Sequence, residues 1–187
     1  MVYFQVKAAV GRIQRLVTLF HHRWAVPVLA ELQRGKGAKL VTLVQRLGAG
    51  RDVLRPTLDR LIEHGWVVRN SGYGHPLRPE YVLSRSGKRI APACARLWQT
   101  LRRSDLTGPG LKKWSLPVAW VLERSGGRFG DAKQMLPGIT SRALTLALKT
   151  LQEAGLVRRE VVDGYPPRPR YHLTPRGRRL VPLVGGL

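Results

Sequence analysis

The chain has 187 residues, and its 33 Lys and Arg side chains outnumber its 11 Asp and Glu side chains, which gives a net charge of +22. A positive field of this strength favours a polyanion as partner. No apolar run approaches the roughly 20 residues that a membrane-spanning helix needs, so we expect neither a transmembrane segment nor a membrane partner.

The N-terminal segment carries an apolar stripe at helical spacing and predicts a first helix. The stripe consists of Val6, Ala9, Val10, Ile13, Leu16, Val17 and Phe20. Arg12 and Arg15 interrupt the segment where a signal peptide would need uninterrupted apolar residues. We therefore expect a cytoplasmic, nucleoid-associated protein. The stripe itself is interpreted as a packing surface, within one chain or between two chains, and not as a ligand site.

From Trp24 onward the chain repeats itself at a fixed offset of 90 residues, without a gap. The matched pairs include Trp24 and Trp114, Pro27 and Pro117, Gly65 and Gly155, Tyr81 and Tyr171, and Gly87 and Gly177. Compositional bias would not hold one register over such a length, so we interpret the chain as a duplication. Between the copies lies SDLTGPG, residues 104–110, whose Gly-Pro-Gly ending interrupts regular structure. The expected domains are residues 1–105, with the N-terminal helix and the first unit, and residues 106–187, with the second unit.

The first copy, from Arg23 to about Arg103, is expected to hold three helices and then a hairpin, in the order that the second copy shows more clearly. Pro56 falls near the start of its third helix, where it either takes a late first-turn position or forces a later start. A second apolar stripe leads to the linker and is interpreted as a packing surface: Ile90, Cys94, Leu97, Trp98 and Leu101. Cys94, the single cysteine, excludes an intrachain disulfide, fits a reducing compartment and is interpreted as a buried apolar residue.

In the second copy, the sequence predicts helices over residues 114–124 and 129–136, with Pro137-Gly138 as the following turn. Thr140 is a good N-cap for a third helix that Gly155 ends. Leucines at helical spacing give this helix a core-facing side: Leu144, Leu148 and Leu151.

After this third helix, residues 156–161 and 170–174 are expected to form two strands of a hairpin with a long loop, and a last helical segment follows Pro175. Three helices followed by a basic hairpin make a winged helix, in which the third helix enters the major groove of DNA. The fold class we expect is mostly α with small β-hairpins (α+β), as tandem duplicated winged helix-turn-helix domains.

The second copy resembles a known family. Its LPGIT turn, its LKTLQEAGLV helix end and its PPRPRYHLTPRG wing return are similar to the HxlR-type winged helix-turn-helix regulators, which are related to the MarR group. The resemblance covers residues 112–183 well and the first copy more weakly. It implies a DNA-binding regulator of transcription; such proteins usually carry one unit per chain, dimerise through terminal helices and bind palindromic operators. This chain instead carries two units, lacks a cysteine near its N-terminus and is unusually basic.

The predicted DNA-binding residues lie on the third helix and the wing of each copy. On the second copy's helix the leucines leave four polar residues outward: Ser141, Arg142, Thr145 and Lys149. The first copy's helix contributes Arg51 and Arg55. The wings contribute Arg78, Arg168 and Arg170. Arg can pair with guanine, and Ser, Thr and the helix N-terminus can hold phosphate. The alternative for each is a solvated surface. Asp59 stands where Lys149 stands in the repeat, and Glu80 where Arg170 stands, so we expect the two copies to read different sequences.

We expect no enzyme, no cofactor and no metal site. The adjacent His21 and His22 point to different faces of a helix, and the sequence holds no GxxxxGK[ST], HExxH or GxSxG motif. Double-stranded DNA is the expected partner of a sequence-specific transcription regulator. A non-specific architectural or replication-associated DNA binder is the alternative, and an RNA binder ranks third. A monomer acting as a pseudo-dimer is favoured over a homodimer, and the sequence names no effector.

Overall fold

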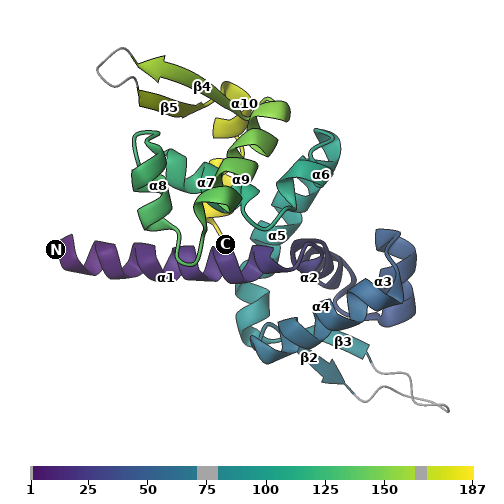
Figure 1. Ribbon diagram of the computed structural model, residues 1–187. Helices are drawn as coiled ribbons and strands as arrows, with labels where there is room; N and C mark the ends of the chain where they lie inside the picture. The colour runs from purple at the N-terminus through teal and green to yellow at the C-terminus, as the bar shows by residue number, and fades with distance from the viewer. Residues whose placement is uncertain (1, 71–79, 163–167) are drawn as a thin grey trace. The chain divides into compact units, whose positions relative to one another are not determined.

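The chain forms two compact units in a computed structural model, which describes residues 2–70, 80–162 and 168–187 (Figure 1) and the side chains of residues 11–70, 80–162 and 169–187. One unit is continuous, His22–Arg103, and we call it the inserted unit. The other combines Met1–His21 with Ser104–Leu187, and we call it the split unit. The contacts thus group the N-terminal helix with the second copy, although it directly precedes the first copy in the chain.

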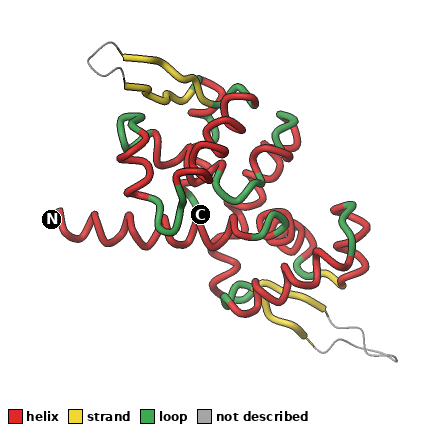
Figure 2. The backbone as a smooth tube through the Cα atoms, viewed as in Figure 1, coloured by secondary structure: helices red, strands yellow, loops and turns green. Residues whose placement is uncertain are grey.

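In its described residues the inserted unit holds four helices and a small sheet (Figure 2, helices in red and strands in yellow). Its elements are α2 (Ala25–Gly35), β1 (Ala38–Lys39), α3 (Leu40–Leu47), α4 (Arg51–Glu63), β2 (Val67–Asn70), β3 (Glu80–Leu83) and α5 (Arg85–Arg103). The strands form an antiparallel sheet in the order β1-β3-β2. Leucines from all four helices are buried together in its core: Leu29, Leu32, Leu43, Leu54, Leu58, Leu61 and Leu97. Burial of these side chains supplies the main stabilising free energy of such a unit.

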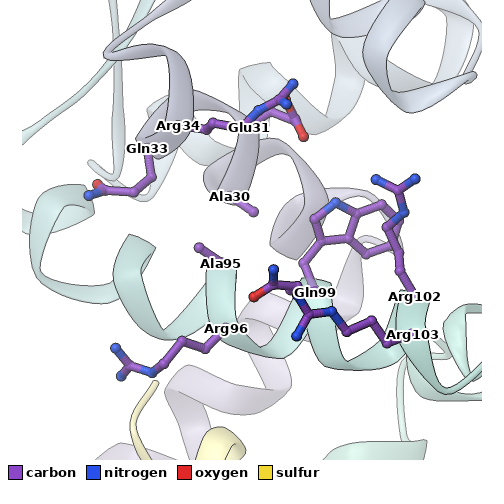
Figure 3. Close-up of a pocket in the computed structure, with 10 residues that line it drawn as sticks. Ala30, Glu31, Gln33, Arg34, Ala95, Arg96, Gln99, Arg102 and Arg103 are labelled. Carbon is purple, nitrogen blue, oxygen red and sulfur yellow. The ribbon is translucent and has the colours of Figure 1, made fainter.

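Helices α2 and α5 pack against each other along much of their length. Ala30 and Ala95 face one another across this pair (Figure 3), and small side chains let two helices approach closely. Glu31 on α2 is buried, which a carboxylate tolerates only with partners. Its Oε2 lies 2.7 Å from Arg34 Nη2 and 3.9 Å from Arg46 Nη1 on α3, so this carboxylate ties α2 to α3.

The split unit is built around one fully buried helix. Its elements are α1 (Val2–His21), α6 (Thr107–Gly110), α7 (Ser115–Leu122), α8 (Phe129–Met135), α9 (Ser141–Glu153), β4 (Val157–Val162), β5 (Arg168–Leu173), α10 (Pro175–Arg178) and α11 (Val181–Gly185). Every residue of α7 is buried, because α1, α8, α9, α11 and β5 all pack against it. Arg15 on α1 donates from Nη1 to the carbonyl oxygen of Leu187 at 3.4 Å. The apolar stripe of α1 is buried from Ile13 through Leu16 and Val17 to Phe20, as a packing surface requires.

The duplication seen in the sequence is present in the backbone. Val67 pairs with Leu83 in the first hairpin, and Val157 pairs with Leu173 in the second, each 90 residues further along. Both recognition-helix candidates, α4 and α9, span 13 residues. Each unit is thus a mostly helical winged helix-turn-helix with a small antiparallel sheet, which confirms the expected fold class.

Three local features differ from the sequence prediction or decide between its alternatives. The linker is not irregular throughout, because Thr107–Gly110 forms one helical turn, α6. Helix α4 starts at Arg51, so Pro56 lies at its sixth position, inside the second turn, and both expected placements, in the first turn or before a later start, are wrong. Strand β5 begins at Arg168, because Arg168 pairs with Val162 and extends the hairpin two residues beyond the expected strand.

Candidate nucleic-acid interface

Helix α9 is positioned by a cap at its start and by leucines along one side. The Thr140 hydroxyl accepts a hydrogen bond from the backbone N–H of Ala143 at 3.1 Å, as an N-cap residue does. Leu144, Leu148 and Leu151 are buried and fix the rotation of the helix about its axis. The expected N-cap and core-facing side are both confirmed.

The opposite side of α9 is exposed and carries all four of the residues that the sequence selected there: Ser141, Arg142, Thr145 and Lys149. The Thr145 hydroxyl donates to the carbonyl oxygen of Ser141 at 2.9 Å, so its oxygen remains available only as an acceptor. Lys149 Nζ lies 3.9 Å from Glu153 Oε1, and both side chains are largely exposed. An exposed pair of this kind is weak, so Lys149 can exchange the carboxylate for a phosphate.

One exposed residue of α9 was missed by the sequence reasoning. Leu146 is 62% exposed, on the same side as Arg142 and Lys149. Its exposure could have been predicted from the spacing, because Leu146 lies two positions after the buried Leu144 and therefore roughly opposite it on a helix. In the repeat its counterpart is Pro56, which is exposed at the same position of α4.

Helix α4 presents a different set of side chains. Arg51 and Arg55 are exposed together with Asp52 and Asp59, as the repeat predicts. Its N-cap is Gly50, which offers no side-chain acceptor. A helix face with alternating charge attracts phosphate less than the face of α9 does, because each carboxylate opposes an arginine.

A further arginine of α4 is occupied by an intrahelical pair. Arg60 donates from Nη1 to Glu63 Oε2 at 2.6 Å, and both side chains are exposed. This hydrogen bond, and then the charge of Arg60, lower the pKa of Glu63 below its usual value. Glu63 therefore stays ionised and competes with phosphate for Arg60 at neutral pH.

The hairpin β4–β5 forms the wing of the split unit and extends away from its helices (Figure 1). Along β4 only Val157 is buried, so the rest of the strand is exposed on both sides. Arg158 and Arg159 are consequently exposed, and neither was selected from the sequence, although the RRE run in a predicted strand was a signal. Arg170, which was selected, is half-buried in β5. The backbone of Arg168 is in β5, and its side chain lies outside the described residues.

The wing of the inserted unit is less basic where it is described. Arg69 on β2 is exposed, and Glu80 on β3 is half-buried at the position that corresponds to Arg170. Arg78, the wing residue selected from the first copy, lies outside the described residues. The difference in charge between the two wings therefore extends the difference between α4 and α9.

A groove of about 630 Å³ lies between α2 and α5 of the inserted unit (Figure 3). Its volume is within the range of about 300–1,000 Å³ that small-molecule sites occupy. Four arginines line it, together with Glu31, two glutamines and Trp98: Arg34, Arg96, Arg102 and Arg103. The Arg102 guanidinium lies 5.7 Å from the centre of the Trp98 ring, so the arginine covers the indole.

Neither a metal centre nor a membrane span emerges from the part of the chain that the structure describes. Within residues 2–70, 80–162 and 168–187, no three His, Cys, Asp or Glu side chains come together as metal ligands. Among the helices in those ranges, none combines the length and the apolar character of a membrane-spanning segment.

Two winged helix-turn-helix units, each with an exposed third helix and a hairpin, define a protein of the helix-turn-helix class. A family model described as "HxlR-like helix-turn-helix" matches the chain twice, over residues 19–104 and 111–187. The chain belongs to the HxlR-like helix-turn-helix family, as the resemblance of its second copy predicted.

Several similar proteins are named as helix-turn-helix transcriptional regulators. An HTH-type transcriptional regulator of Methanothermobacter thermautotrophicus is 37% identical over 75 residues, which are 40% of this chain and 57% of the relative. YybR of Bacillus subtilis, also named an HTH-type transcriptional regulator, is 46% identical over 72 residues, which are 38% of this chain and 58% of the relative. The regulator sll1512 of Synechocystis is 39% identical over 72 residues, or 38% of this chain and 53% of the relative. The chain thus spans little more than half the length of the relatives it matches.

Proposed function

We propose that this protein is a DNA-binding transcriptional regulator that reads duplex DNA with two non-identical recognition helices. The observation that carries the proposal is the face of α9, where Ser141, Arg142, Thr145 and Lys149 are exposed together on a capped helix. Arg142 is suited to guanine, the uncapped N–H groups of the first helical turn to phosphate, and Lys149 to the neighbouring strand backbone. The names of the relatives point to the same function.

In this proposal the wings bind the DNA backbone beside each recognition helix. Arg168 and Arg170 of one wing, and Arg78 of the other, supply the charge, with Arg158 and Arg159 as additions from the structure. Together with Arg51 and Arg55 on α4, they provide enough cations for several phosphates. The assigned role is binding without catalysis, on the DNA of the nucleoid.

One chain acts as a pseudo-dimer in this proposal. A regulator with one unit must dimerise to place two recognition helices about 34 Å apart, and its two-fold symmetry demands a palindrome. Here a single chain carries both units, and Asp59 replaces Lys149 in the repeat. The expected binding site is therefore asymmetric and about two half-sites long.

Selection of bound duplexes from a random pool, followed by footprinting and light scattering of the complex, tests this function. We expect one enriched, asymmetric sequence bound by one chain. A homodimer on a palindrome of four half-sites would overturn the pseudo-dimer and leave DNA reading intact. Equal binding to all duplexes would favour an architectural DNA binder, and preference for RNA would overturn the DNA assignment.

A further inference from the structure

The exposed leucine in the middle of α9 has no structural task in its own unit. A side chain that is 62% exposed contributes little to the core, and Leu146 is the one exposed leucine among the large apolar side chains that the described residues place on the surface. The others there are valines: Val41, Val53, Val68, Val161 and Val162. A single exposed leucine is ordinary on a protein surface. What distinguishes Leu146 is its position among the polar side chains of a recognition helix.

Leu146 is the sixth of the 13 residues of α9 and lies beside Arg142 at the edge of the exposed polar face. On a helix, residues three and four apart are neighbours, so Leu146 lies between Arg142 on one side and Lys149 on the other. Thr145 is adjacent and exposed. The first copy agrees at the matching position, because the sixth residue of α4, Pro56, is also apolar and exposed. Both helices thus place an apolar group at the same outward position, although their charges differ.

We infer that Leu146 reads thymine, by contact of its side chain with the C5-methyl group in the major groove. This methyl group is the one apolar feature that bases present there, and it distinguishes thymine from the other three bases. The inference rests on the proposed function, since it requires α9 to lie in the groove. The inference adds to that function the identity of one base, which the middle of α9 selects.

The geometry of the helix limits where this thymine can be. Leu146 follows Arg142 by four residues, which is about 6 Å along the helix axis. Base pairs are stacked about 3.4 Å apart. For a helix that follows the groove, the guanine bound by Arg142 and the thymine bound by Leu146 are therefore expected about two base-pair steps apart.

The closing experiment removes the methyl group from the DNA and the leucine from the protein, separately and together. Thymines of the selected site are replaced one at a time by deoxyuridine, which lacks only the C5-methyl group. Binding is measured for the unchanged full chain and for Leu146→Ala. This variant is expected to keep the fold, because Leu146 is exposed and alanine is a strong helix former. Circular dichroism of both proteins confirms the helix content.

At one thymine, deoxyuridine is expected to weaken binding of the unchanged protein about 4-fold, as loss of one buried methyl-sized contact does. Leu146→Ala is expected to bind both duplexes equally at that position. Val161→Ala, which removes an exposed apolar side chain from β4 instead, is the matched control and should keep the 4-fold difference.

Two failures are distinguishable. If selection enriches no sequence, the proposed function is overturned and the thymine contact with it. If a sequence is enriched but no deoxyuridine weakens binding, or if Leu146→Ala keeps the same 4-fold difference, only the thymine contact is overturned.

Discussion

The hydroxyl of Thr174 donates a hydrogen bond to the carbonyl oxygen of Gly155 at 2.8 Å, and so joins the start of α10 to the end of α9. It also accepts from the backbone N–H of Gly177 at 3.1 Å. Ninety residues earlier, Ser84 makes the same two bonds, to Gly65 at 2.6 Å and from Gly87 at 3.0 Å. The same pair of side-chain hydrogen bonds therefore follows both recognition helices and fixes where each helix ends.

Removing either hydroxyl should destabilise its own unit by a similar amount. We expect Thr174→Val and Ser84→Ala each to cost about 1 kcal/mol, within the 0.5–2 kcal/mol typical of lost caps. The measurement is urea unfolding of each variant, with amide exchange to identify the unit that opens. The exposed Thr145→Ala on α9 is the control and should leave the stability nearly unchanged. Equal stability of all three variants would contradict a role for these bonds.

Binding to duplex DNA should depend strongly on salt, because two helices and two wings neutralise phosphates. With about 6 to 10 phosphate contacts, the affinity should fall about 10³- to 10⁵-fold between 50 and 200 mM salt. Fluorescence anisotropy with a labelled duplex measures this slope. A flat dependence would argue against binding through these basic residues.

Two arginines of the split unit should have separable roles. Arg142→Ala should cost about 1–3 kcal/mol on the preferred sequence and relax the preference for one base, whereas Arg168→Ala should weaken all sequences more evenly. Arg178→Ala removes the same charge from α10 and serves as the control. If Arg142→Ala and Arg168→Ala lower every affinity equally, sequence preference does not reside in α9.

The N-terminal helix should stabilise the split unit and not the unit that follows it in the chain. Leu16 on α1 is 1% exposed, and Leu16→Ala should cost about 2–5 kcal/mol of the split unit's free energy of unfolding. Leu29→Ala on α2 makes the same change in the inserted unit. Amide exchange in α7 and α9, compared with α2 and α5, separates the two effects. Faster exchange of α2 and α5 in Leu16→Ala would reverse the assignment of α1.

The thiol of Cys94 should be inert in the folded protein. Burial raises its pKa from the ordinary 9.0 to about 12, because the charged thiolate is poorly solvated there. Since the folded pKa is the higher one, its contribution to stability is complete below pH 9 and is lost as the pH rises toward 12. Ellman's reagent at pH 8 should react slowly with the native chain and rapidly after guanidinium unfolding. Rapid reaction of the native thiol would make Cys94 a candidate redox sensor.

Much of each unit was predictable because its signals are local. The cap at Thr140, the leucine spacing and the glycine that ends the helix lie within 16 residues, and the backbone at Gly155 has the φ of +67° that favours glycine. The repeat matches Gly177 with Gly87, and the structure explains the glycine: a Cβ at Gly177 would collide with the carbonyl oxygen of Leu156.

The features that the sequence did not predict depend on distant contacts or on burial. The association of α1 with α7 joins segments about a hundred residues apart, and an apolar stripe alone does not say which surface it covers. The backbone bridge between Arg128 and Arg170 joins segments about forty residues apart, and no local pattern signals it.

The division of the chain into an inserted and a split unit sets the order in which the protein can fold during synthesis. Helix α1 leaves the ribosome first, but its partner α7 follows only after the whole of His22–Arg103. At about 5–20 residues per second, the delay from the end of α1 to the end of α7 is about 5–20 s. The inserted unit therefore acquires its structure while α1 still exposes Leu16 and Phe20. During that interval the nascent chain carries an apolar helix face whose partner has not yet been synthesised.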